Sequence, residues 1–183
     1  MRIIAGSARS RTILTPEGQD TRPTLDRVRE SLFNILQLRV REARVLDLFA
    51  GSGALALESL SRGASSAVMV DHSRQAIACI RKNVETLRFS DRARIMHTDW
   101  RAAVDTLRRE GAEFDLVMLD PPYAMTELSE VTEALKPLLS DDALLIIEHD
   151  IRTTPHVADG YDATDTRKYG IVGVTFFRPV PED

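Results

Sequence analysis

The sequence predicts an α/β fold in which a mostly parallel β-sheet is covered by helices on both faces. From about residue 45, short apolar runs alternate with amphipathic stretches of helix length, which is the pattern of consecutive β-α units. The 183 residues are 43% hydrophobic and include only nine glycines and eight prolines, a composition that supports a well-packed core. We expect one domain over 1–183, in which an N-terminal hairpin and basic appendage (1–22) precede a Rossmann-like core (23–183).

The N-terminal region is expected to form short elements of its own. Segments 2–5 and 11–14 flank a turn-rich stretch and are typical of the two strands of a β-hairpin. A polar loop then leads to Thr24, which we expect to cap a helix. The apolar residues that would place one face of this helix against the core are Leu25, Val28, Leu32, Ile35 and Leu36.

The remaining elements follow from apolar runs and from residues that begin or end helices. Ser73 is a typical N-cap, and Gly63 ends the helix before it. The last two strands flank a turn at Tyr169 and Gly170, so we expect the final strand to be antiparallel. The expected strands are 45–50, 67–70, 94–96, 116–119, 143–148, 161–168 and 171–177, and the expected helices are 54–62, 74–87, 100–109 and 127–138.

Composition and charge limit the possible functions. Cys79 is the only cysteine, which excludes an internal disulfide, and the four histidines show no metal-ligand spacing. No apolar run approaches the ~20 residues of a membrane span, and no signal peptide is evident, so we expect a cytoplasmic protein that binds no metal. The net charge is −4, yet residues 1–44 carry nine arginines against five acids. This asymmetry indicates a local surface for a polyanion.

The first core strand runs into a glycine turn and then a helix. Gly51 and Gly53 allow the backbone to turn sharply and to approach a ligand, and the N-terminus of the following helix has a positive potential. Asp71 ends the next strand, where a carboxylate can accept both hydroxyls of an adenosine ribose. The pattern predicts a nucleotide-cofactor site. An NAD site and a purely structural turn are the alternatives.

Asp47, just before the glycine turn, distinguishes between two cofactors. A carboxylate there would repel the pyrophosphate of NAD but attract the ammonium and sulfonium groups of S-adenosylmethionine. At about 4 Å and an effective dielectric constant near 20, one such contact is worth about 4 kcal/mol before desolvation. The sequence therefore favours S-adenosylmethionine. The residues expected to bind it are Asp47, Phe49, Ala50, Gly51, Ser52, Gly53, Asp71 and His72.

Asp99 and Trp100 follow the third core strand at the same edge of the sheet. Asp99 is positioned to accept a hydrogen bond from the adenine amino group, and Trp100 to stack on the adenine ring. The alternative is a helix N-cap followed by a partly buried tryptophan. Beside Asp47 and Asp71, we favour the cofactor role.

The string Asp120-Pro121-Pro122-Tyr123 follows strand 116–119 and is the most specific motif in the chain. The two prolines lack N–H groups and fix φ, so this segment is expected to be rigid and extended at the ligand edge of the sheet. It offers a carboxylate, the Pro121 carbonyl and an aromatic ring, which suit a flat base with an exocyclic amine. The two acceptors would hold the amine so that its lone pair points at the methyl group. A proline-braced structural turn is the alternative.

These motifs resemble class I S-adenosylmethionine-dependent methyltransferases that act on exocyclic amines. Segments 2–6, 22–36 and 169–170 narrow the resemblance to the bacterial 16S ribosomal RNA guanine-N2 methyltransferase family. The resemblance extends from Met1 to about Phe177 and implies a seven-stranded methyltransferase fold with an N-terminal hairpin. It also implies S-adenosylmethionine as cofactor and a guanine in 16S rRNA or the small ribosomal subunit as substrate.

The resemblance implies a role for each matching residue. It assigns residues 47–53 to the cofactor loop, Asp71 to the ribose, and Asp99 and Trp100 to the adenine. Separately, we expect the protein to act as a monomer. Arg22 and Thr24 match a segment near the active site, whose contact with cofactor or substrate stays open. The implied catalytic residues are Asp120, Pro121, Pro122 and Tyr123, and the implied substrate-binding residues are Arg2, Arg9, Arg11, Arg22 and Thr24.

Two other functions fit part of the sequence. An adenine-N6 methyltransferase acting on RNA or DNA would share the motif that begins at Asp120. However, a carboxylate suits the adjacent N1–H and N2–H donors of guanine better than the amine and N1 acceptor of adenine. A catalytically silent RNA-binding factor for ribosome assembly would not need Asp120 or the glycine turn. A dehydrogenase is a poor third, because no acid/base for hydride transfer is present.

Overall fold

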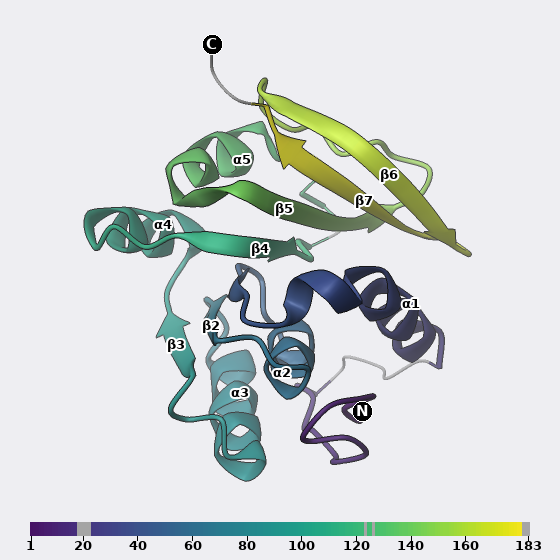
Figure 1. Ribbon diagram of the computed structural model, residues 1–183, viewed down its shortest axis with the longest axis vertical. Helices are drawn as coiled ribbons and strands as arrows, with labels where there is room; N and C mark the ends of the chain where they lie inside the picture. Colours follow the sequence, from purple (N-terminus) through teal and green to yellow (C-terminus); the bar gives the residue numbers. More distant parts are fainter. Residues whose placement is uncertain (18–22, 123, 126, 181–183) are drawn as a thin grey trace.

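The computed structural model describes residues 1–17, 23–122, 124–125 and 127–180 (Figure 1). A seven-stranded sheet has the order β3-β2-β1-β4-β5-β7-β6. Strands β1 to β5 are parallel, and β7 is antiparallel to both β5 and β6, which confirms the predicted mixed sheet. The strands are β1 (Arg44–Asp47), β2 (Ser66–Asp71), β3 (Ala93–His97), β4 (Phe114–Leu119), β5 (Leu139–Asp150), β6 (Tyr161–Tyr169) and β7 (Val172–Pro179).

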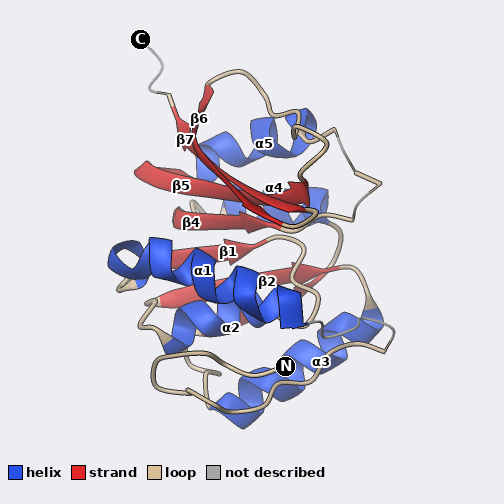
Figure 2. Ribbon diagram, turned by 90° about the vertical axis from the view of Figure 1, so that its right-hand side faces the viewer, coloured by secondary structure: helices blue, strands red, loops and turns tan. Residues whose placement is uncertain are grey.

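Helices cover both faces of this sheet, as the alternating sequence pattern predicts (Figure 2). α1, α2 and α3 pack on one face, and α4 and α5 pack on the other. In the described part of the chain, no helix is long and apolar enough to cross a membrane. The helices are α1 (Pro23–Val40), α2 (Ala54–Ser61), α3 (Arg74–Leu87), α4 (Trp100–Arg109) and α5 (Ser129–Leu135), with a 3-10 turn at Lys136–Leu138.

Successive residues of the central strands face two separate cores. Val45 and Leu116 pack beneath α1, α2 and α3, whereas their neighbours Leu46 and Val117 pack against α4 and α5. Because helices bury both faces, these strands are apolar along their length instead of alternating with polar residues. In β1 and β4, polar residues are thereby confined to positions at or next to the ends of the strands.

Most strand boundaries differ from the prediction by one or two residues, and β5 begins four residues earlier and ends two later than expected. Three further differences have a local cause. Strand β1 ends at Asp47 and not at residue 50, because the chain leaves the sheet for the glycine turn. Helix α1 begins at Pro23, so Thr24 lies inside its first turn and is not the N-cap; a proline at the first helical position needs no N–H partner. The helix expected at 127–138 is shorter, and its last part is the 3-10 turn that contains Pro137.

The predicted N-terminal hairpin is wrong. In the described part of this segment, its two sides meet at one isolated antiparallel bridge between Arg2 and Thr12, with backbone hydrogen bonds from Ile3 N–H to the Arg11 carbonyl and from Ile13 N–H to the Met1 carbonyl, both 3.0 Å. The backbone N–H groups of Ile4 and Ala5 donate instead to the Glu58 carboxylate of α2, at 2.8 and 3.0 Å. Because side chains of α2 supply the acceptors, this stretch follows the helix and forms no regular strand pair.

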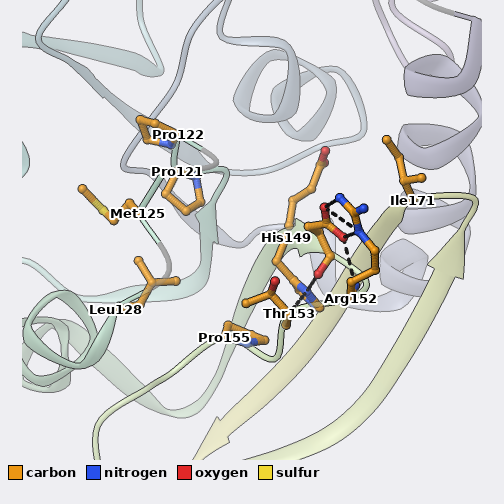
Figure 3. A pocket seen from close by; sticks show the side chains of 11 residues that line it. Pro121, Pro122, Met125, Leu128, His149, Arg152, Thr153, Pro155 and Ile171 are labelled. Atoms are coloured by element: carbon orange, nitrogen blue, oxygen red, sulfur yellow. Dashed lines mark hydrogen bonds and ion pairs between the residues drawn. The ribbon is translucent and has the colours of Figure 1, made fainter.

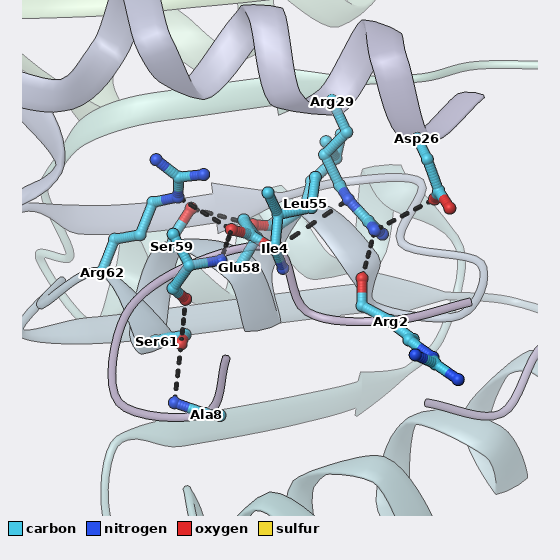
Figure 4. A network of polar contacts seen from close by, with 11 residues as sticks. Arg2, Ile4, Ala8, Asp26, Arg29, Leu55, Glu58, Ser59, Ser61 and Arg62 are labelled. Carbon is cyan, nitrogen blue, oxygen red and sulfur yellow. Dashed lines mark hydrogen bonds and ion pairs between the residues drawn. The ribbon is translucent and has the colours of Figure 1, made fainter. Parts of the chain in front are cut away.

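A buried ionic network fixes this segment to α1 and α2 (Figure 4). The Glu58 side chain is fully buried and accepts a hydrogen bond from Arg62 Nε at 2.8 Å. Arg29 of α1 lies with its Nε 4.0 Å from Glu58 and donates a hydrogen bond to the Arg2 backbone carbonyl. The network therefore joins the basic N-terminal segment to the helix that follows the glycine turn.

Candidate active site

Four acidic residues lie along one edge of the sheet, at or near the carboxyl ends of their strands. Asp47 ends β1, Asp71 ends β2, Asp120 follows β4, and Glu148 lies close to the end of β5. The negative charge of Asp120 raises the pKa of both Asp47 and Glu148, which places Asp120 between them. In open α/β sheets this edge is where ligands bind.

Asp47 is the most unusual of these groups. Asp47 is 1% exposed, and neither carboxylate oxygen has a partner within hydrogen-bond geometry in the described residues; the Ala56 backbone N–H is near enough only to oppose part of the rise in its pKa. Burial, followed by the charges of Asp120 and Asp71, raises the pKa of Asp47 to about 8. An unpaired buried carboxylate is costly, so this group is suited to a cationic ligand. The ammonium and sulfonium of S-adenosylmethionine fit that requirement, whereas a pyrophosphate does not.

The glycine turn between β1 and α2 has the geometry that only glycine adopts readily. Gly51 and Gly53 have φ values of 55° and 79°, and a Cβ atom on Gly53 would lie 3.1 Å from the Met69 sulfur. Asn83, a buried residue of α3, donates a hydrogen bond to the Ser52 carbonyl at 3.0 Å. Sequence reasoning missed Asn83, although a polar residue on the apolar face of a predicted helix was a usable signal.

Asp71 lies next to the same turn and organises its backbone. Its Oδ2 accepts the Gly51 N–H at 2.8 Å, and its Oδ1 accepts the Ser73 N–H at 2.7 Å. Each oxygen can accept one further hydrogen bond. The side chain of His72 is exposed beside it. The remaining expected loop residues, Phe49, Ala50, Ser52 and Gly53, lie between β1 and α2.

Asp99 and Trp100 have the geometry of a helix N-cap followed by a buried tryptophan. Asp99 is the N-cap residue of α4, and its Oδ1 accepts hydrogen bonds from the backbone N–H groups of Arg101 and Ala102, at 2.9 and 3.2 Å. The Trp100 ring is 8% exposed, and the Arg101 guanidinium lies 4.4 Å from its centroid. Packing and capping account for both side chains, and their contacts with adenine stay a prediction.

Pro121 and Pro122, which follow Asp120 in the chain, border a cavity of about 380 Å³ (Figure 3). Although Asp120 is solvent-accessible from the cleft, protein atoms crowd its other sides, and this desolvation raises its pKa to about 6. Tyr123 lies outside the described residues. The cavity is lined by Pro121, Pro122, Met125 and Leu128 on one side and by Glu148, His149, Asp150, Arg152, Thr153, Pro155 and Ile171 on the other.

The expected substrate-binding arginines are only partly placed. Arg2, Arg9 and Arg11 are exposed on the N-terminal segment, and Arg11 donates to the Thr86 carbonyl of α3 at 2.6 Å. Arg22 and the side chain of Thr24 lie outside the described residues. The structure therefore presents a basic segment on the surface without showing which arginines reach the cleft.

Comparisons with known proteins show the family and the fold of the chain. The family described as Conserved hypothetical protein 95 matches residues 1–178. Ribosomal RNA small subunit methyltransferase D of Escherichia coli strain K12 is 38% identical over 153 residues, which cover 82% of this chain and 75% of that protein. The structure of yhhF from Escherichia coli has a TM-score of 0.85 at 34% identity, covering 100% of this chain and 99% of that one. SMU.776 in complex with SAH shares the fold, with a TM-score of 0.69 at 15% identity over 82% of this chain and 48% of that one.

Proposed function

Since the chain belongs to the family described as Conserved hypothetical protein 95, we propose that it methylates the exocyclic N2 amine of a guanine in the 16S rRNA of the small ribosomal subunit. Its cofactor is S-adenosylmethionine, and methyl transfer is its class of reaction. The relative from Escherichia coli that is named as a small-subunit methyltransferase supports ribosomal RNA as the acceptor.

One observation carries the proposal: Asp120 lies between the unpaired Asp47 carboxylate and the cavity beside Pro121. Asp47 would bind the cationic end of the cofactor, with the glycine turn and Asp71 alongside it. Asp120 and the Pro121 carbonyl would receive the target base from the cavity side. The cofactor and the acceptor amine are thereby brought to one point at the sheet edge.

The bound cofactor supplies an electrophilic methyl group carried by a sulfonium. The task of the protein is then to hold a weakly nucleophilic amine in line with it, because the lone pair of an exocyclic amine is delocalised into the ring. Asp120, with a pKa of about 6, is largely ionised at neutral pH and can accept one amine N–H. The Pro121 carbonyl would accept the other. Positioning and electrostatics of this kind require no covalent intermediate with the protein.

Two features support guanine in RNA over the other acceptors. Guanine presents N1–H and N2–H as neighbouring donors, which suit the carboxyl groups of this sheet edge, whereas adenine places an acceptor beside its amine. The exposed arginines at positions 2, 9 and 11 are suited to phosphate contacts that position the RNA. No role of these arginines in reading the base is required.

The experiment is a methyl-incorporation assay with labelled S-adenosylmethionine and three acceptors: small subunits that lack the modification, free 16S rRNA and duplex DNA. We expect label in subunits or free RNA and none in DNA. Label only in DNA would refute the proposal. No label in any acceptor, together with thermal stabilisation by RNA but not by the cofactor, would indicate the silent assembly factor instead.

A further inference from the structure

Glu148 is a carboxyl group of the site that the motifs at Asp47, Asp71 and Asp120 do not include. Strands β4 and β5 are parallel, and Leu119 pairs with Ile147, so the next residue on each strand brings Asp120 and Glu148 together. Leu119 and Ile147 face the α4 and α5 core, and Glu148 faces the opposite side of the sheet, as Asp47 does. Glu148 therefore extends the row of acids from the cofactor end into the cavity.

The other polar residues of this cavity wall already have partners. Asp150 forms an ion pair with Arg152, with 2.9 Å between Oδ1 and Nε (Figure 3). His149 Nε2 lies 2.8 Å from the Thr175 hydroxyl. In the described part of the chain, Glu148 has neither an ion pair nor a side-chain hydrogen bond. Burial and the charge of Asp120 raise its pKa to about 8. A polar group held in this way at a cavity wall is suited to a ligand hydrogen bond.

We propose that Glu148 is a specificity-determining residue that accepts the N1–H of the target guanine while Asp120 accepts from its N2 amine. The inference rests on the proposed function, because it places the same base in the same cavity. N1 and N2 are attached to one carbon of guanine, so their acceptors must be neighbours, as Asp120 and Glu148 are. The carboxyl group of Glu148 offers an acceptor oxygen whether it is neutral or ionised. The hydrogen bond from N1–H can therefore form in either protonation state of Glu148.

The test compares acceptors that differ at N1. 2-Aminopurine keeps the amine on C2 but has no N1–H and no carbonyl at position 6. The acceptor preferred in the incorporation assay is prepared with guanine or 2-aminopurine at the methylated position, and kcat/KM is measured for both. We expect the wild-type protein to prefer guanine by about 100-fold or more, because a site built to accept a hydrogen bond discriminates strongly against an analogue without the donor.

Three variants distinguish base reading from a structural role. Glu148→Leu is expected to reduce the preference for guanine at least tenfold, whereas Glu148→Gln, which keeps an acceptor oxygen, retains most of it. Asp142→Asn changes an exposed carboxyl of the same strand outside the cavity and is expected to leave the preference unchanged. Binding of SAH and the thermal midpoint establish that each variant is folded.

Two results would overturn the inference: a wild-type protein that does not discriminate between the bases, or a Glu148→Leu variant that is slowed equally on both and keeps the preference. Failure of the wild-type protein to methylate any guanine acceptor would instead refute the proposed function. The two failures are therefore separable.

Discussion

Replacing Asp47 by asparagine tests whether the site holds an unpaired carboxyl group that ionises when a cationic ligand binds. In the folded protein the pKa of Asp47 is raised from its ordinary 3.8 to about 8, by burial first and by Asp120 and Asp71 second. Between these two values the folded state holds a proton that the unfolded chain releases. Stability is therefore highest below the unfolded pKa and is lost as the pH rises toward the folded pKa.

The magnitude follows from proton linkage. One proton corresponds to about 1.4 kcal/mol per pH unit, so Asp47 lowers the free energy of unfolding by about 3 kcal/mol between pH 5 and pH 7.5. The asparagine side chain of the variant would not titrate, although its amide would still be buried without a partner. The difference in stability between Asp47→Asn and wild type should thus shift in favour of the variant by about this amount as the pH rises.

The assay is urea denaturation at a series of pH values from 5 to 7.5, with calorimetric binding of S-adenosylmethionine to both proteins. We expect the variant to gain stability relative to wild type with rising pH while its cofactor affinity falls about tenfold or more, since it loses a charge contact. A difference in stability that does not change with pH would refute the burial argument. Unchanged cofactor affinity would refute the assignment of Asp47 to the cationic ligand.

Three further changes probe the site and its support. Asp120→Asn should reduce kcat about 100-fold or more while the Kd for SAH stays within about threefold. The kcat of the wild-type protein should fall as the pH drops below about 6, because Asp120 is then protonated. Equal losses of kcat and of SAH affinity in the variant would contradict the catalytic role. Gly6→Ala should lower the free energy of unfolding by about 2 kcal/mol or more, because at φ +85° the added Cβ would lie 1.8 Å from the Ser61 carbonyl oxygen. The control Gly170→Ala, at φ +65° with open space around it, should lower it by only about 1 kcal/mol. Equal losses in denaturation experiments would refute the contact between Gly6 and α2. Glu58→Ala should lower the free energy of unfolding by about 3 kcal/mol or more, because it leaves buried donors and the Arg29 charge uncompensated. It should also abolish the protection of the Ile4 and Ala5 amides against hydrogen exchange. Retained protection would show that the network does not hold the segment.

The core of the fold could be predicted because its signals are local. Apolar runs such as Val45-Leu46 and Val117-Met118 belong to strands covered on both faces, and Ser73 caps α3 as expected. The N-terminal hairpin could not be predicted in the same way. The backbone N–H groups of Ile4 and Ala5 donate to Glu58, which lies more than 50 residues away in sequence and whose burial becomes evident only when α2 is packed.

The candidate site was predictable where a strand end coincides with a motif. Asp47, Asp71 and Asp120 each follow an apolar run, so a common sheet edge brings them together without further information. Glu148 lies inside a strand that continues to Asp150, and only the pairing of β5 with β4 places it beside Asp120. The surroundings of Trp100 could not be predicted from its sequence position alone. Its place after a strand suggested a ligand contact, whereas packing beneath Arg101 accounts for its burial.

The identity of the methylated nucleoside tests the central claim most directly. Small subunits that lack the modification are incubated with the protein and S-adenosylmethionine, their RNA is digested, and the nucleosides are identified by mass spectrometry against N2-methylguanosine and N6-methyladenosine standards. The account predicts N2-methylguanosine with wild-type protein and almost none with Asp120→Asn. N6-methyladenosine, or product formed equally well by the Asp120→Asn variant, would contradict it.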